Sequence, residues 1–266
     1  MFNTQGVNML INTFFGVTLN AARGIAVQIE HTILNFVDNF TTAINPQITK
    51  SYAEGNLAYM HSLVCRGARF SYFLMLIFAV PIWTETEQIL SLWLKIVPEY
   101  AVPFVRLTLV TSMCTVIGKT LITSQLATGK MKRYQITVTL CGLWVFPLTW
   151  IAFEFGFSPI WAYLIYAFIY FILIFIRIYL VKDLIKMPWQ LYIRDVFGRC
   201  VLVTVLSLAI PLSIVLIQES SIFRLIEVII IGGLTTIGSI FVWGLDKTER
   251  LFIIMQIKKR LNNIMA

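Results

Sequence analysis

Charged residues are scarce in this sequence. Asp, Glu, Lys and Arg make up 13% of the 266 residues, against roughly 25% in a typical soluble domain. Hydrophobic residues make up 58%, and the mean hydropathy is +0.82. So few charges do not cover this much apolar surface in water. We therefore predict an all-α, polytopic membrane helix bundle.

Cysteine and histidine are also rare. The four cysteines and two histidines show no metal-ligand spacing and no disulfide framework. We expect the cysteines to be packing residues, and we expect no metal or other cofactor.

A membrane enzyme that acts on saccharides needs acid, base or nucleophilic groups outside the membrane, usually on a large outer loop. The outer connections are short and hold neither histidine, so we do not expect an enzyme.

Long apolar runs give the topology, because about 20 residues of helix cross the hydrocarbon core. Eight segments fit this pattern or a less apolar helical version of it: Gln5–Thr18, Leu19–Ile44, Phe70–Trp83, Pro103–Leu126, Tyr134–Phe153, Pro159–Ile176, Val201–Ile217 and Val228–Leu245.

The basic residues divide unequally when alternate loops are assigned to the two sides of a membrane. One side holds only Lys95, Arg106 and Arg224. The other holds Lys50, Arg66, Arg69, Lys130, Lys132, Arg133, Lys182, Lys186, Arg194, Arg199, Lys247, Arg250, Lys258, Lys259 and Arg260. Positive charge concentrates on cytoplasmic loops. We therefore place both termini in the cytoplasm and attribute the net charge of +8 to membrane topology, not to nucleic-acid binding.

The second expected span carries an unusual polar stripe. At 100° per residue, its polar residues lie within an arc of about 100°, while the large apolar residues face the other way. We expect Pro46 to end this helix. The first span shows a shorter version of the stripe, because Gln5, Asn8 and Asn12 share one face. The stripe of the second span consists of Asn20, Arg23, Glu30, His31, Asp38, Thr41 and Asn45.

An ionised side chain that faces lipid at the bilayer centre costs roughly 2.5–3.5 kcal/mol, so the stripe must face protein or water. One interpretation is a ladder of ion pairs between helices. Another is a helix lying flat on the membrane, which its few Lys and Arg residues disfavour. We favour a helix that lines a water-filled cavity. Lys119, in the span around 103–126, either faces the same cavity or extends to the cytoplasm, as we expect for Arg177.

Three segments outside the expected spans have amphipathic or interfacial sequence patterns. Residues 84–102 contain TETEQILSLWL, which predicts a short interfacial helix on the outer surface. Residues 182–199 mix basic and aromatic side chains, and we expect a separate amphipathic helix on the cytoplasmic leaflet. The tail after Asp246 repeats this design with a Lys258–Arg260 basic cluster.

Five segments taken together resemble a known family: NAARGIA, PQITKSYAEGN, LIFAVP, ILSLWL and ATGKMKRYQ. Their order among the spans is similar to that of the polysaccharide (lipopolysaccharide and O-antigen) flippases of the multidrug/oligosaccharidyl-lipid/polysaccharide exporter superfamily. The resemblance implies two lobes around a central cavity. Residues 1–181 would be the second lobe, and residues 182–266 an amphipathic linker, two trailing helices and a basic tail. The first lobe would belong to the same full-length protein.

The resemblance also implies an activity. Such proteins carry polyprenyl-diphosphate-linked oligosaccharide across the bacterial inner membrane by alternating access. Arg23 aligns with an arginine implicated in holding the diphosphate, although Ala22 replaces an aspartate of the related lipid II flippases. For Glu30 and Asp38 the expectation comes from the polar stripe and not from the resemblance: they either bind a coupling proton or sodium ion or balance the charge of Arg23. Contacts to the substrate are expected from Asn8, Asn12, Asn20, Thr41, Asn45 and Lys119.

Two other interpretations remain open at this stage. A drug or cation antiporter of the same superfamily would favour acids and aromatic residues in its cavity, without a central arginine. A chain that lacks its first lobe would be an inactive fragment, since half of a transporter does not enclose a cavity.

Overall fold

The protein is built entirely from helices within the described part of the chain. The computed structural model describes residues 2–265, with side chains described for residues 5–256 and 258. Six helices are long and apolar enough to cross a membrane: Leu57–Thr84, Ala101–Ala127, Lys132–Glu154, Ile160–Lys182, Trp189–Ile217 and Ile222–Gly244. The expected all-α, multi-pass membrane bundle is confirmed.

Short interruptions divide several of these spans. The elements are α1 (Phe2–Phe15), α2 (Leu19–Ala53), α3 (Leu57–Thr84), α4 (Thr86–Trp93), α5 (Ala101–Ile117), α6 (Lys119–Ala127), α7 (Lys132–Leu143), α8 (Val145–Glu154), α9 (Ile160–Lys182), α10 (Trp189–Tyr192), a π-helical turn (Ile193–Gly198), α11 (Arg199–Ile217), α12 (Ile222–Ser239), a second π-helical turn (Ile240–Gly244) and α13 (Lys247–Met265).

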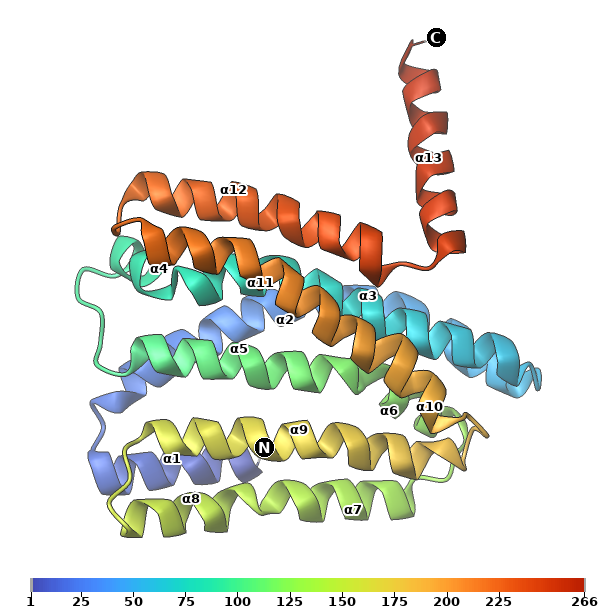
Figure 1. Ribbon diagram of the computed structural model, residues 1–266. Coiled ribbons are helices and arrows are strands. Elements are labelled where there is room, and N and C mark those ends of the chain that lie inside the picture. Colours follow the sequence, from blue (N-terminus) through green and yellow to red (C-terminus); the bar gives the residue numbers. More distant parts are fainter. Residues whose placement is uncertain (1, 266) are drawn as a thin grey trace.

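The helices stack in layers (Figure 1). α2 and α5 lie at the centre, where α2 packs against α3 and α5 packs against α9. On one side, α7 and α8 pack against α9, and the short α1 packs against α8. On the other side, α11 and α12 pack together against α3. α13 leaves the bundle at a steep angle to the spans (Figure 1).

α1 and α2 are helices, but neither is among the six apolar spans. α1 has 14 residues, which at 1.5 Å per residue is about 21 Å, shorter than the hydrocarbon core. It ends before Gly16, whose positive φ of 80° suits a helix terminus. α2 has 35 residues and carries the ionisable stripe. The count of eight crossings therefore stays a prediction for these two.

The expectation that Pro46 ends the second helix is wrong. α2 runs through Pro46 to Ala53. A proline inside a helix costs about 3 kcal/mol or more, so other contacts must compensate. Beyond the proline, Ile48 is fully buried and shares the core with Met60 and Val64 of α3. Packing on α3 therefore outweighs the local preference of proline.

A separate amphipathic helix over residues 182–199 is also wrong. α9 continues to Lys182, and a helix that reaches Ile217 begins again at Trp189. Tyr192, Val196, Cys200 and Val203 are all buried at nearly helical spacing, so this segment packs into the bundle as the start of the next span. The Tyr192 hydroxyl donates to the Ile117 carbonyl where α5 ends.

Arg177 is packed inward, contrary to the expectation that it extends to the cytoplasm. It is only 9% exposed. Its guanidinium lies over Gly118, at the break between α5 and α6, so closely that a Cβ built there would lie 2.6 Å from Nη1. Glycine is the residue that leaves room for this contact.

A buried ion pair joins the two trailing helices to the rest of the bundle. Nε and Nη2 of Arg224 donate to the two oxygens of Glu85 at 2.7 and 2.8 Å. Glu85 precedes α4 and is 2% exposed, and Arg224, in the first turn of α12, is 8% exposed. Arg224 also donates to the Gln218 carbonyl and to Ser220, so four of its five N–H groups have acceptors.

A second charged cluster lies where α12 gives way to α13. Arg69 of α3 pairs with Asp246 at 3.1 Å and with Glu249 at 2.7 Å. Arg199 also contacts Asp246, and Arg66 contacts Glu249. Partial burial of Asp246 raises its pKa, but the hydrogen bonds and charges of Arg69 and Arg199 outweigh this and hold the pKa below its ordinary value.

The tail is helical, as expected. α13 exposes Leu251, Phe252, Ile254 and Met255. The side chains of Lys259 and Arg260, part of the expected basic cluster, lie outside the described residues.

Substitution Arg224→Ala is expected to lower the free energy of unfolding by about 3–5 kcal/mol, because it leaves the Glu85 carboxylate buried without a counter-charge. The measurement is denaturant unfolding in detergent, followed by loss of helical signal. Lys50→Ala is the control, because it removes only the exposed pair of Lys50 with Glu54. Equal stability of the two variants would contradict the role given to Arg224.

The depressed pKa of Asp246 predicts a pH-dependent contribution to stability. The folded protein binds this proton more weakly than the unfolded chain, so the contribution is complete above the unfolded pKa, about 3.9. It is lost as pH falls through the folded value. Asp246→Asn should therefore unfold at a lower temperature than the unsubstituted protein at pH 7, and this difference should shrink below about pH 4. A difference that is constant from pH 7 to pH 3 would refute the assignment.

Candidate functional site

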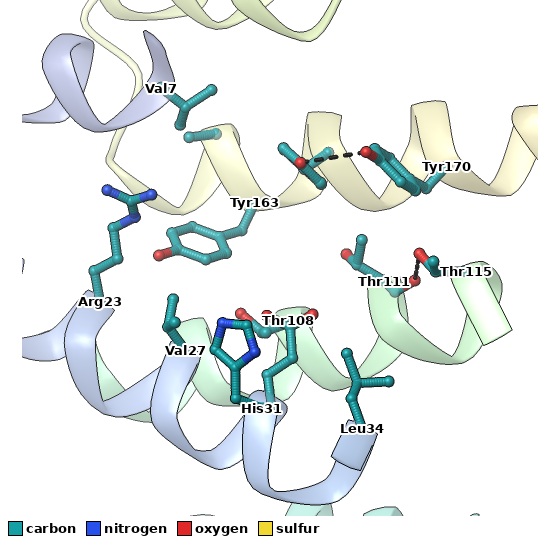
Figure 2. Close-up of a pocket in the computed structure, with 13 residues that line it drawn as sticks. Val7, Arg23, Val27, His31, Leu34, Thr108, Thr111, Thr115, Tyr163 and Tyr170 are labelled. Carbon is teal, nitrogen blue, oxygen red and sulfur yellow. Dashed lines mark hydrogen bonds between the residues drawn. The ribbon is translucent and has the colours of Figure 1, made fainter. Parts of the chain in front are cut away.

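A cavity of about 290 Å³ lies between α1, α2, α5 and α9 (Figure 2). Its lining joins residues that are far apart in the sequence. The lining residues are Val7, Arg23, Val27, Glu30, His31, Leu34, Thr108, Thr111, Thr115, Ala162, Tyr163, Tyr166 and Tyr170.

Helical spacing explains two of the walls. Thr108, Thr111 and Thr115 follow at i, i+3 and i+7 on α5, and Tyr163, Tyr166 and Tyr170 follow the same spacing on α9. This spacing puts each set on one face of its helix. Because α5 packs against α9, the threonine face and the tyrosine face border the same space.

Arg23 lies at one end of the cavity. Its side chain is half-buried and comes from the first turns of α2. Figure 2 shows the hydroxyl end of Tyr163 directed toward the region between Arg23 and α2, and the Tyr163 hydroxyl lies within electrostatic range of both Arg23 and Glu30. Because a guanidinium stays protonated at physiological pH, Arg23 gives this end of the cavity a permanent positive charge.

Glu30 occupies the same wall, two helical turns farther along α2. The buried hydroxyl of Ser112 on α5 donates a hydrogen bond to its Oε1 atom. His31, next in the sequence, also lines the cavity. A cation and an acid therefore share one wall, separated along the helix by about 10 Å.

The tyrosine wall is ordered by ring contacts. Tyr166 and Tyr170 are stacked, with centroids 4.7 Å apart and ring planes 11° apart, and their hydroxyls are 3.4 Å apart. The ring of Tyr163 stacks on Phe104 of α5 at 4.1 Å. These residues combine flat apolar surfaces with hydroxyl groups, which suits ligands with both apolar faces and hydrogen-bonding edges.

Asp38 and Lys119 lie outside this cavity and pair with each other. The Lys119 ammonium, on α6, donates to the Asp38 carboxylate on α2. The Asp38 side chain is 54% exposed. Here the polar stripe forms an ion pair between helices, the first of the three interpretations given for it.

Two further residues of the stripe contact neighbouring helices. The Thr41 hydroxyl is 3.2 Å from that of Ser71 on α3, and Asn45 accepts from Thr123 of α6 at 2.8 Å. Asn20 is half-buried and outside the cavity lining. Of the substrate and ion contacts predicted from the sequence, Arg23 and Glu30 line the cavity.

Asn8 and Asn12 have a different environment. Both are half-buried on α1, and the amide oxygen of each is inaccessible to solvent without a hydrogen-bond partner. Neither lines the cavity, although the neighbouring Val7 does. A buried acceptor without a donor is unfavourable, so these two oxygens have unused hydrogen-bonding capacity beside the site.

Sequence reasoning did not identify the threonine and tyrosine walls. The repeated i, i+3, i+7 spacing was the available signal, and it is the same spacing that singled out Gln5, Asn8 and Asn12. Among the described residues, no group of three or more His, Cys, Asp or Glu side chains is arranged to hold a metal ion.

Comparisons of the chain with protein-family models, with curated proteins and with solved structures found no match.

The division of the polar stripe can be tested by thiol labelling. Thr111 lines the cavity and Thr41 packs against Ser71, yet their exposed fractions are similar, 7% and 5%. In a background without the four native cysteines, Thr111→Cys should react with a small water-soluble thiol reagent, because only a hydrated cysteine ionises readily. Thr41→Cys should not react. Equal labelling of both variants would contradict the assignment of Thr111 to a water-filled cavity.

Proposed function

We propose that this chain is part of a membrane transporter that moves a lipid-linked saccharide diphosphate across the bacterial inner membrane by alternating access. The supporting observation is a cavity within the helix bundle that combines a guanidinium group, a carboxylate and a tyrosine wall. An ionisable residue inside a membrane bundle is most often functional, and Arg23 and Glu30 line the same wall of this cavity.

Arg23 supports an anionic ligand. The guanidinium carries a permanent charge, and its planar donors match phosphate oxygens better than a lysine ammonium does. Its position at one end of the cavity leaves the tyrosines for the rest of the ligand. The aromatic faces of Tyr166 and Tyr170 suit the apolar face of a sugar ring, and their hydroxyls suit its edges.

The size of the cavity indicates that it would bind only part of the substrate. A volume of about 290 Å³ is at the lower end of the usual range for ligand sites, about 300–1,000 Å³. This volume suits a diphosphate or a single sugar unit better than an oligosaccharide. We propose that the remainder of the substrate contacts a first lobe in the full-length protein, with residues 1–181 forming the second lobe and residues 182–266 the trailing part.

Glu30 is the better candidate for ion coupling. Asp38 is neutralised by Lys119, whereas Glu30 lines the cavity and accepts a hydrogen bond from Ser112. Binding of a proton or a sodium ion at Glu30 would change the charge of the cavity beside Arg23. Moving one charge through the membrane potential contributes about 2.3 kcal/mol per 100 mV, enough to shift a conformational equilibrium.

The topology proposed here puts both termini in the cytoplasm. The grouping of loops behind this proposal is supported by the ion pair of Glu85 with Arg224, because both residues lie in loops assigned to the same side. Arg69, Arg199 and Asp246 form their cluster together, as their assignment to a single side of the membrane requires.

A cation antiporter is the second candidate, and a specific observation favours it. Glu30 and three tyrosines line one cavity, and cations bind to carboxylates and to aromatic faces. Arg23 in the same cavity opposes a cationic ligand, so we rank this function second. Uptake of a cationic dye that depends on Glu30 and increases in Arg23→Ala would favour the antiporter.

Arg23→Ala in the full-length protein is expected to reduce transport of lipid-linked saccharide about 10- to 100-fold, the effect of losing a charged hydrogen bond of about 1.5–3 kcal/mol. Arg23→Lys should retain part of the activity, because it keeps the charge but not the planar donor geometry. The measurement is flipping in proteoliposomes. Arg194→Ala is the control, because Arg194 is exposed and outside the cavity. Full activity in both Arg23 variants would remove Arg23 from the site.

A further inference from the structure

A second hollow, of about 540 Å³, lies at the start of α7, away from the cavity of Figure 2. It is formed by the loop before α7 and by the end of α9. Its lining residues are Gly129, Lys130, Met131, Lys132, Arg133, Tyr134, Tyr179, Leu180, Asp183 and Leu184. Three of these are basic and one is acidic.

The basic side chains are not used elsewhere in the bundle. Lys130, Lys132 and Arg133 are exposed, and none forms an ion pair within the part of the chain that the structure describes. Lys132 is also the first residue of α7, and no side chain caps this end of the helix. The first-turn N–H groups of an uncapped helix attract anions.

Tyr134 provides an independent indication of a ligand. It lines the hollow and is only 3% exposed. Its hydroxyl is buried without a hydrogen-bond partner. Arg177 lies close enough to influence this hydroxyl electrostatically, and the buried Nε atom of Arg177 also lacks a partner. Buried polar groups are seldom left unsatisfied. Of these two residues only Tyr134 lines the hollow, so its hydroxyl is the donor that a ligand there would satisfy.

The hollow continues into an apolar furrow. A neighbouring depression of about 430 Å³ shares Arg133, Tyr179 and Leu180 with it and adds Phe175, Ile176 and Thr137. The furrow follows α7 and α9 into the part of the bundle that spans the membrane. A ligand that fills both parts has an anionic head and an apolar tail. A soluble anion would leave the furrow empty.

We propose that these two hollows form a binding site for one anionic phospholipid of the membrane leaflet that borders the start of α7. The phosphate lies against Lys132, Arg133 and the first turn of α7, with Tyr134 as a further donor. An acyl chain lies along Phe175 and Ile176. Lys182, whose ammonium is 4.3 Å from the centre of the Tyr179 ring, lies beside the head group. This site is independent of the transport function proposed above.

The test measures binding of dioctanoyl phosphatidylglycerol to the purified full chain by native mass spectrometry. Lys132→Gln combined with Arg133→Gln should weaken binding about tenfold or more, since each cation near an anionic lipid contributes about 1 kcal/mol. Tyr134→Phe, which removes one oxygen atom, should weaken it about threefold or more. Lys50→Gln, an exposed lysine outside the hollow, is the control and should bind normally.

Three comparisons decide the outcome. Dioctanoyl phosphatidylcholine should bind much more weakly than phosphatidylglycerol, and inorganic phosphate should not compete. Equal binding of the zwitterionic lipid, or competition by inorganic phosphate, would overturn the proposal, the latter in favour of a soluble anion. Unchanged binding in Tyr134→Phe and in the double variant would also overturn it. Tyr134→Phe keeps the test decisive if the double variant does not fold.

Discussion

A charge placed among membrane helices needs either a counter-charge or water, and this requirement shapes the whole molecule. Glu85 and Arg224 satisfy it by a bidentate pair in a nearly dry setting. Asp38 and Lys119 satisfy it by pairing across two helices at a partly exposed position. Arg23 and Glu30 border a cavity instead. The same physical constraint therefore produces structural links in two places and a candidate binding site in the third.

The polar stripe of α2 shows how far the sequence determines function. Periodicity correctly indicated that its polar residues share one side of the helix, and a single use was expected along its length. The structure divides the stripe because α2 crosses several neighbours. Its first half meets α5 and α9 around a cavity, whereas Thr41 and Asn45 meet Ser71 and Thr123. Periodicity assigns a face to a residue, but tertiary packing decides what that face contacts.

Other features of the fold also divide into those that local sequence signals predict and those that depend on long-range packing. The helical class and the short helix after Thr84 were accessible from composition and local signals. The passage of α2 through Pro46 was not, because burial of Ile48 on α3 is a long-range contact. The threonine and tyrosine walls had a readable spacing, but such residues are common on membrane helices. Only the packing of α5 on α9 makes these two faces a site.

The break between α5 and α6 has a consequence for how freely this sequence can vary. Arg177 from α9 rests on Gly118, and Tyr192 from α10 binds the carbonyl of Ile117. Segments from three regions of the chain thus meet at one backbone position. Enlarging Gly118 would displace the guanidinium. Moving Tyr192 would leave its hydroxyl without the Ile117 carbonyl as acceptor in a buried setting. The three positions must change together or not at all, whereas the faces around the cavity can diversify one residue at a time.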